Sequence, residues 1–528
     1  MFTCFTYSEG LSMIKFDSLK TFPIINFKAA KPTTEKNVIG QKQDGDSFQL
    51  SIGYINDTHG QINNQLRILS GIKGDIRLSA GDDQIGSEEN HKVNEAAVKF
   101  LDGANIFARA IGNHEMDTTT QDFCDLNRNH KTKLLAVNFR EKLTRPDKTD
   151  FNEIKKDSII AEIKGEKIGL IGACPNDMME RVNDANYIKD CETDNYYVTL
   201  QRIKTNIENF KAQGINKIFL LSHLGHNKNQ DIAQKIEGID VIIGGHTHEL
   251  LKDIKEGENL FYSPNGEPVI ITQAGKDGHH FGTLNVEFDK DGVITKAQNN
   301  IHRTCKYPKS FVHEYITNQI LGKAEVVGEI GEVIPPPENV YISENAHSNF
   351  VCDVMKEATG ADIALWNSAG IRNSFHVGKI NDREIREISP FADKTTVVPI
   401  TEKELVDGFN MAIKSSFTSA SNKPGIYAVS GLNYSISKSQ AKLTAMNFID
   451  KQGNEIPINI ENPDPNKVYK VVATKFITSG GDGISVFNKI KDAYIVYPFD
   501  KDKLVCDYLK KQTEPVSINQ VGRIKFED

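Results

Sequence analysis

The chain has 528 residues, of which 38% are hydrophobic and 25% charged, and its formal net charge is −8. Because this length exceeds what one hydrophobic core usually supports, at least two domains are expected. The sequence has no dense run of Lys or Arg, which argues against nucleic-acid and anionic-membrane partners. It also has no apolar stretch approaching the ~20 residues of a membrane-spanning helix.

Residues 1–46 are polar and are interrupted by Pro32 and Gly40. They predict a poorly ordered leader with one short strand around residues 22–27. The first twenty residues have no basic segment followed by an apolar one, so no secretory signal peptide is recognisable. At face value this favours a cytoplasmic protein, but a misassigned start would hide an export signal and the compartment stays open. The seven cysteines are scattered without C-x-x-C spacing, which favours free thiols over a zinc–thiolate site or disulfides.

Residues 47–315 predict a layered α/β domain. Short apolar stretches alternate there with amphipathic ones, such as residues 200–210, which show helical spacing and stop before Gly214. Five of the apolar stretches read as buried strands that end abruptly in small and polar residues. In open α/β sheets, ligands bind outside the carboxyl ends of the strands. The side chains at these five ends are Asp57, His59, Asp82, Asn113, His114, His223, His246 and His248.

This set of side chains predicts a metal centre. Asp57 and His59 share one side of a strand end because alternate residues do so. Asp82 suits a bridging position, since a carboxylate can bind one metal through each oxygen, and Asn113 offers an amide oxygen. The imidazoles complete enough ligands for two metals, and metals about 3.5–4 Å apart support displacement at phosphorus. Mixed nitrogen and oxygen ligands suit Zn, Mn, Fe or Co. Each motif alone also fits a turn or a helix cap, so the prediction rests on their joint arrangement.

The remaining chain predicts a second domain. A helix-like stretch begins at residue 311, and residues 316–339 form the expected linker helix and boundary, which ends near the three prolines Pro335, Pro336 and Pro337. Residues 340–528 mix a helix at 349–359 with strands at 395–400 and 469–474, which predicts a smaller α+β domain. A further segment, QAGKDGHHFG at residues 273–282, follows another strand of the first domain, and its His279 and His280 could border the metal centre.

The series DTH, GDD, GNHEMD, SHLGH and GGHTH resembles the calcineurin-like metallophosphoesterases, and the whole of residues 48–528 resembles the two-domain 5′-nucleotidases. That family is usually periplasmic or extracellular. The resemblance implies a four-layer α/β/β/α domain followed by a substrate-binding domain. It implies one metal held by Asp57, His59, Asp82 and His248, and a second held by Asp82, Asn113, His223 and His246. His114, oriented by Asp117, would stabilise the transition state or protonate the leaving oxygen.

The resemblance also implies a nucleotide pocket in the second domain. NSAGIRNS would contribute Asn367 and Arg372, since Arg suits phosphate or ribose oxygens. Tyr427 would supply one of two aromatic rings that sandwich the base, and Asp482 of SGGDGIS would contact the nucleoside.

Three positions depart from the family pattern and predict an altered or relaxed substrate pocket. Ile484 stands where the second aromatic ring is usual, although Phe487 lies nearby. Ser343 stands where Arg usually precedes the Glu, and Asp393 where Asn is common. Losing one stacking face would weaken base binding by roughly 1–3 kcal/mol.

The strand-end motifs predict a metal-dependent phosphohydrolase that acts on a small phosphoester, with a metal-activated water as nucleophile. The resemblance implies nucleoside 5′-monophosphates as the default substrate. A 2′,3′-cyclic-nucleotide phosphodiesterase or another phosphoesterase on the same fold is the alternative. A non-catalytic nucleotide-binding protein is less expected because every ligand position is filled. The oligomeric state is open.

Overall fold

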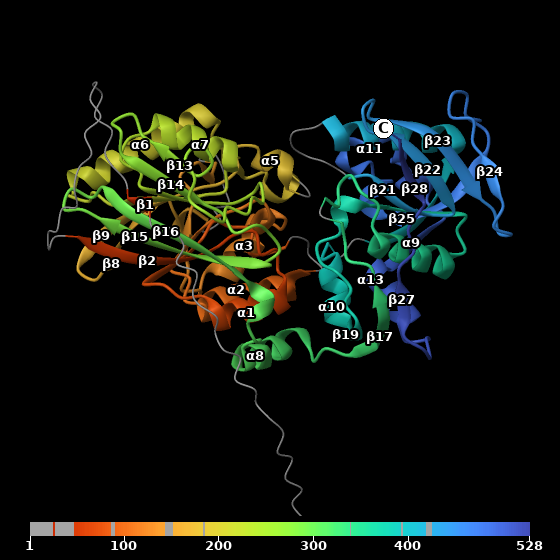
Figure 1. Cartoon of the computed structure of the whole chain (residues 1–528), viewed down its shortest axis with the longest axis horizontal. Helices are drawn as coiled ribbons and strands as arrows, with labels where there is room; N and C mark the ends of the chain where they lie inside the picture. The colour runs from red at the N-terminus through yellow and green to blue at the C-terminus, as the bar shows by residue number, and fades with distance from the viewer. Residues whose placement is uncertain are drawn as a thin grey trace, which may run out of the picture.

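The computed structural model describes residues 25–26, 47–85, 90–142, 151–182, 185–337, 339–391, 394–418 and 425–527. Two domains lie side by side and are joined near helix α8 (Phe311–Leu321), as Figure 1 shows. The predicted leader lies outside the described residues, apart from strand β1 (Ile25–Asn26), which confirms the short strand expected there. None of the helices in the described ranges is long and apolar enough to cross a membrane.

The first domain contains an eight-stranded mixed sheet, ordered β1-β16-β15-β2-β3-β4-β5-β7. Its strands from β2 to β7 run parallel, whereas β15 pairs antiparallel with β2, and β16 with β15 and β1. The bounds are β2 (Phe48–Ile55), β3 (Ile76–Ser79), β4 (Ala108–Ala110), β5 (Lys133–Leu135), β7 (Lys155–Lys156), β15 (His280–Phe288) and β16 (Ile294–Arg303).

A second mixed sheet of six strands faces the first and is ordered β13-β14-β12-β11-β9-β8. Its four central strands are parallel, and β13 and β8 pair antiparallel at the edges. The bounds are β8 (Ser158–Ile163), β9 (Glu166–Ala173), β11 (Ile218–Ser222), β12 (Val241–Gly244), β13 (Leu260–Tyr262) and β14 (Pro268–Thr272). A two-stranded sheet joins β6 (Phe139–Glu141) and β10 (Cys191–Thr193).

Helices cover the outer faces of both sheets, which confirms the four-layer arrangement. In β11, Phe219 and Leu221 pack into the core between the sheets, while Ile218 and Leu220 pack beneath the helices. This alternation is the signature of a strand buried on both faces. The helices are α1 (Ile62–Gly71) and α2 (His91–Gly103) against the first sheet, α6 (Tyr196–Ala212) and α7 (His226–Lys235) against the second, and α3 (Thr120–Asn127), α4 (Phe151–Ile154) and α5 (Met178–Arg181) at the side.

The chain passes into the second domain earlier than the expected linker suggests. Helix α8 stops before Gly322, whose φ of 82° is left-handed and ends the helix. Strand β17 (Val326–Val333) then pairs with β19 (Gly378–Asn381) and β27 (Val516–Ile518). Part of the predicted linker is therefore a strand of the second domain.

The second domain is an α/β domain around a five-stranded mixed sheet, ordered β21-β18-β25-β20-β26. Ile363 and Leu365 of β18 pack on one face, and Ala364 and Trp366 on the other. The strands are β18 (Ile363–Asn367), β20 (Lys394–Thr401), β21 (Tyr427–Ser430), β25 (Val468–Thr474) and β26 (Ile495–Asp500), with β22 (Leu432–Ser437), β23 (Lys442–Ile449), β24 (Glu455–Pro457) and β28 (Ile524–Glu527) in a second sheet. The helices are α9 (Ala346–Thr359), α10 (Asp382–Ile388), α11 (Glu402–Thr418), α12 (Lys475–Thr478) and α13 (Lys501–Leu509).

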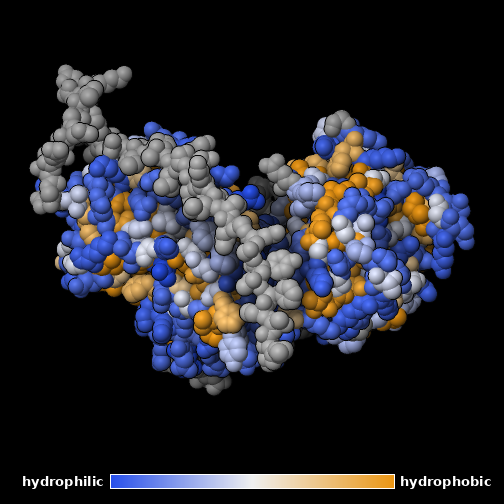
Figure 2. All heavy atoms as spheres, turned by 60° about the horizontal axis from the view of Figure 1, so that its bottom comes forward, coloured by the Kyte–Doolittle hydropathy of each residue, from blue (hydrophilic) through white to orange (hydrophobic). Residues whose placement is uncertain are grey.

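The two domains meet through a buried polar clamp and an apolar contact. Glu387 of α10 accepts hydrogen bonds from the backbone N–H and the side-chain amide of Asn63, at 2.8 and 2.7 Å. It thereby caps α1, whose own N-terminal residue Gln61 makes no side-chain cap. Phe391 packs against an apolar cluster of the first domain that includes Leu66 and Val93. Figure 2 shows the surface hollowed between the domains.

Candidate active site

Five strand ends from two facing sheets converge on one group of side chains. β2, β3 and β4 come from the eight-stranded sheet, and β11 and β12 from the six-stranded sheet, so the common rim expected from the sequence is built by a pair of sheets. Each of three groups of residues brings one donor atom per residue within 4.8 Å of the others. These groups are Asp57, His59 and His248; His59, Asp82 and His114; and Asp82, His223 and His246.

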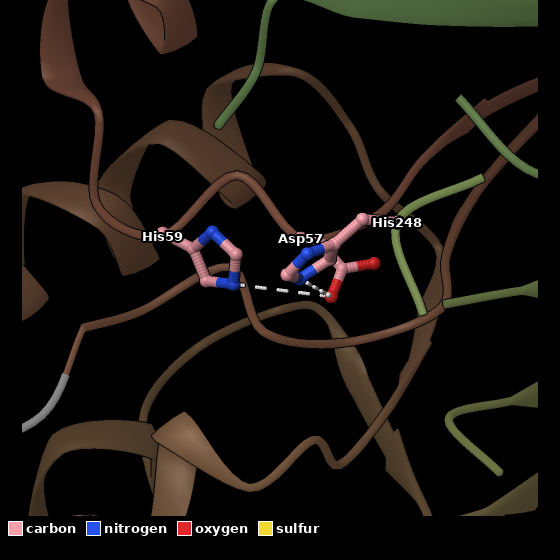
Figure 3. A group of neighbouring side chains, drawn as sticks. All are labelled: Asp57, His59 and His248. Atoms are coloured by element: carbon pink, nitrogen blue, oxygen red, sulfur yellow. Dashed lines mark ion pairs between the residues drawn. The ribbon is translucent and has the colours of Figure 1, made fainter. Parts of the chain in front are cut away.

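Asp57 and Asp82 lie at the centre of the cluster. Asp82 Oδ2 lies 3.0 Å from Nε2 of His223 and 3.7 Å from Nε2 of His59, so this carboxylate reaches both halves. Asp57 Oδ1 lies 3.4 Å from Nε2 of His248 and 3.8 Å from Nε2 of His59. Figure 3 shows both imidazole rings directed at the Asp57 carboxylate.

Several donor atoms of the cluster are buried without hydrogen-bond partners. They are Nε2 of His59, Nε2 of His223 and Oδ1 of Asn113. Such atoms are rare in folded proteins, because a buried polar atom without a partner loses its hydrogen bonds to water and gains none in exchange. Two carboxylates, several imidazoles and an amide oxygen facing one small space fit a dinuclear site for divalent cations.

The backbone is left-handed at five predicted ligands. The φ angles are 49° at Asp57, 47° at His59, 54° at Asp82, 79° at His246 and 66° at His248. Non-glycine residues rarely adopt this conformation, which costs about 1–3 kcal/mol each. These five residues follow the ends of β2, β3 and β12, so local backbone strain marks three of the five strand ends independently of side-chain chemistry.

Charge interactions perturb the pKa values of the cluster. Burial alone would lower the pKa of His59 and of His223, but the neighbouring carboxylates raise them to about 9 and about 10. Burial would raise the pKa of Asp57, but His223 and His248 outweigh it and lower that pKa to about 2. The carboxylates of the cluster therefore stabilise positive charge placed among them.

His114 stands beside the cluster and is oriented by a carboxylate. Its Nδ1 lies 2.6 Å from Oδ2 of Asp117, and the two side chains are 17% and 1% exposed. Its backbone N–H donates to Asp82 Oδ1 at 2.8 Å. The structure thus brings the predicted pair together, with Nε2 as the ring nitrogen left for other partners.

Arg372 approaches the cluster from the second domain. Its Nε and Nη1 are buried without partners, and its guanidinium lies 5.0 Å above the ring of Phe391. A cavity of about 580 Å³ between the domains is lined by Arg372 and Tyr341 and by Lys276 and Asp277 of the first domain. A buried guanidinium with free donors at such a cavity is suited to an anionic ligand.

Comparison with known families agrees with this geometry. Residues 50–250 match the calcineurin-like phosphoesterases, and residues 322–489 match the 5′-nucleotidase C-terminal domain. The chain belongs to the two-domain 5′-nucleotidase family. It is a metallophosphoesterase, and its specific substrate is not determined by these matches.

Individual relatives cover most of this phosphoesterase. It is 27% identical over 90% of its length to the trifunctional nucleotide phosphoesterase protein YfkN of Bacillus subtilis, of which it spans 35%. It is 26% identical to the 5′-nucleotidase of Rattus norvegicus, with 81% of this chain and 77% of that protein aligned. The crystal structure of a 5′-nucleotidase precursor from Thermus thermophilus shares the fold, with a TM-score of 0.71 at 24% identity over 91% of this chain and 99% of that one.

Two carboxylates at the site of this phosphoesterase were missed by the sequence prediction. Glu115 accepts hydrogen bonds from the backbone N–H groups of Asp82, Asp83 and Gly112, each at 2.8 Å, and so ties the end of β3 to that of β4. Asp277 lies 2.8 Å from Nδ1 of His59. Its segment was noted for its histidines, of which His279 lines the interdomain cavity, but nothing in the spacing marked Asp277.

The glycines of GNHE and GGHTH are required by close contacts. A Cβ on Gly112 would lie 2.1 Å from Asp82 Oδ1, and one on Gly245 would lie 2.9 Å from Nδ1 of His223. Any side chain at these two positions would displace a predicted ligand.

The predicted nucleotide pocket of the second domain is only partly present. Asn367 donates to Asp482 Oδ2 at 3.3 Å, so the NSAGIRNS and SGGDGIS motifs do meet. Tyr427, however, is only 3% exposed and packs in the core, with its ring 5.4 Å from Phe409 and 5.8 Å from Phe487. The prediction of a base-stacking ring at Tyr427 is corrected here, because Phe409 of α11 and Phe487 pack against that ring in the core.

The departures noted in the sequence have different fates. Ile484 and Phe487 are 2% and 1% exposed and belong to the same core as Tyr427, so neither offers a second stacking ring. Ser343 is half-buried, and Asp393 lies outside the described residues.

Proposed function

We propose that this phosphoesterase is a 5′-nucleotidase that hydrolyses nucleoside 5′-monophosphates to nucleoside and phosphate. The observation that carries the proposal is the unpartnered guanidinium of Arg372, which shares the interdomain cavity with Asp277 and hence borders His59. With divalent cations bound in the cluster, a phosphate monoester seated between them and Arg372 would have positive charge on both sides.

The cluster divides naturally into two cation positions around Asp82. Asp57, His59, Asp82 and His248 would hold one ion, and Asp82, Asn113, His223 and His246 the other. Divalent cations bound there would neutralise the phosphate oxygens and make water a usable nucleophile near neutral pH. The distances of Asp82 Oδ2 to His59 and His223 support its bridging role.

His114 is proposed as the group that serves the leaving oxygen. Its hydrogen bond to Asp117 holds the ring with Nδ1 as donor, so Nε2 can carry a proton toward the ester oxygen. His114 lies within reach of the cluster atoms, so the same arrangement permits it to act on a substrate bound there.

A cyclic-nucleotide phosphodiesterase is the second candidate. Tyr427 and Ile484 lie in the core, so the site lacks the pair of rings that would grip one base in one orientation. A looser base site tolerates a substrate that approaches with its 2′ and 3′ oxygens toward the metals. The similarity to a protein named as a trifunctional nucleotide phosphoesterase supports retaining this candidate.

A substrate panel tests the proposal. Phosphate release from AMP, 2′,3′-cyclic AMP and p-nitrophenyl phosphate would be compared in Mn²⁺ or Zn²⁺, with a nucleotidase added where needed to detect a monoester product. A higher kcat/KM for AMP than for the other two substrates is expected. A preference for the cyclic ester would favour the second candidate, and equal rates on all three would contradict recognition of the nucleoside.

A further inference from the structure

The loop between β14 and β15 places the carboxylate of Asp277 behind His59, one of the proposed metal ligands. Asp277 Oδ1 lies 2.8 Å from Nδ1 of His59, and both side chains are at most 1% exposed. A carboxylate only accepts hydrogen bonds, so the neutral imidazole must keep its proton on Nδ1. Nε2 is then the nitrogen with a lone pair, and it is the atom that faces Asp57 and Asp82.

Asp277 is itself held firmly in place. Its backbone N–H donates to the carbonyl oxygen of Asp57 at 2.6 Å, and its carbonyl oxygen accepts from Asn64 Nδ2 at 2.8 Å. Its φ of 56° is left-handed, as at the predicted ligands. Lys276 Nζ lies 3.7 Å from its other carboxylate oxygen. The loop is thus fastened to the strand end that carries His59, and its carboxylate is a fixed part of the site.

The corresponding histidine in the other half of the cluster has a different partner. Nδ1 of His223 lies 2.7 Å from the backbone carbonyl oxygen of Ala80, which is a neutral acceptor. A carboxylate behind an imidazole increases the basicity of the metal-facing nitrogen and adds a negative charge, whereas a carbonyl adds none. The two halves of the cluster are therefore unequal.

We propose that Asp277 is a positioning residue that makes the His59 position the tighter of the two metal positions. The inference rests on the proposed dinuclear function. Asp277 acts through His59, because it fixes the tautomer and the orientation of that ring. Loss of such a partner weakens metal affinity by about 10–100-fold.

The test is the isosteric variant Asp277→Asn, which keeps the shape and removes the charge. Metal-stripped protein would be titrated with Mn²⁺ by calorimetry, with EPR to distinguish isolated ions from a spin-coupled pair. We expect the tight position to weaken about 10–100-fold and the weaker position to stay unchanged. Asp277→Glu should restore part of the affinity. Asp291→Asn, at a side chain that is 67% exposed in the next hairpin, is the matched control and should match the wild type.

A folded Asp277→Asn variant with unchanged tight affinity would overturn the inference, and so would equal weakening at both positions. If that variant does not fold, ¹⁵N-histidine spectra of the Zn²⁺-loaded wild type decide, since a proton on Nε2 of His59 there contradicts the inference. Failure of the proposed function is distinguishable, because the wild type itself would then bind no Mn²⁺ pair and release no phosphate.

Discussion

The Asp/His cluster of the first domain and the predicted nucleotide pocket of the second domain are built in different ways. Each predicted ligand follows a buried strand, and at five of the seven a left-handed backbone conformation follows the strand end. The predicted nucleotide pocket depends instead on side chains from separate segments, and the elements that pack over these side chains decide their exposure. Asn367 and Asp482 meet there, but Tyr427 is covered. Residues at strand ends can therefore be placed from the sequence more reliably than residues whose exposure depends on packing.

The largest expected effect is at the bridging carboxylate. Asp82→Asn removes the charge shared by both halves of the cluster, so both proposed ions should be lost and turnover should fall to background. Metal content per chain and phosphate release from AMP would be measured together. Asp125→Asn, at a side chain that is 61% exposed, is the control. Full metal content and activity in Asp82→Asn would contradict the bridging role.

Next in size is His114→Ala. Turnover of AMP should fall by about 10²–10⁴-fold, because the alkoxide leaving group then departs without a proton. p-Nitrophenyl phosphate should be affected much less, since nitrophenolate needs no proton, and metal content should not change. His130 forms a similar pair outside the cluster, with its Nδ1 2.9 Å from Oδ2 of Asp102, so His130→Ala is a matched control. Equal losses on both substrates would argue against a proton donor.

Arg372→Ala should act mainly on KM. A charge-assisted hydrogen bond is worth about 1.5–3 kcal/mol, or roughly 10–150-fold. Arg372→Lys should recover little, because an ammonium lacks the planar fork. Steady-state kinetics on AMP measures both, with the half-exposed Arg386→Ala as control. An unchanged KM for every phosphoester would separate the second domain from phosphate binding.

Substitution of Tyr427 tests whether its ring stays in the core of the second domain or contacts the substrate. Tyr427→Leu should lower the free energy of unfolding by about 1–3 kcal/mol through poorer packing, with little change in KM for AMP. Chemical denaturation and kinetics would be measured on the same preparation. A rise in KM at unchanged stability would show that the ring leaves the core to stack on the base.

The clamp between the domains predicts the smallest effect on chemistry. Burial is the main cause that raises the pKa of Glu387 to about 7, with Glu384 adding to it and Lys309 and the bonds from Asn63 opposing it. A raised folded-state pKa means that its stabilisation is complete below pH ~4.5 and is lost as pH rises through about 7. The melting temperature of Glu387→Gln should therefore rise relative to that of the wild type above that pH. Parallel pH profiles of the two proteins would contradict this assignment.

The residues of the Asp/His cluster were predictable because each lies in a short motif at a strand end, and apolar periodicity locates strand ends. Asp277 was not, since it lies 218 positions after His59 and meets that residue only when the chain folds back. Glu115 looks like an ordinary acidic residue in the first turn after GNH, and only the structure shows four backbone N–H groups donating to it. The burial of Tyr427 depends on α11, which no local pattern relates to β21.

The most direct measurement couples metal occupancy to turnover. Metal-stripped protein would be titrated with Mn²⁺ while metal per chain and phosphate release from AMP are followed together. Activity is predicted to be absent without metal and to saturate as the second ion binds. Turnover that persists in stripped protein, or that saturates at one ion per chain, would contradict the dinuclear account.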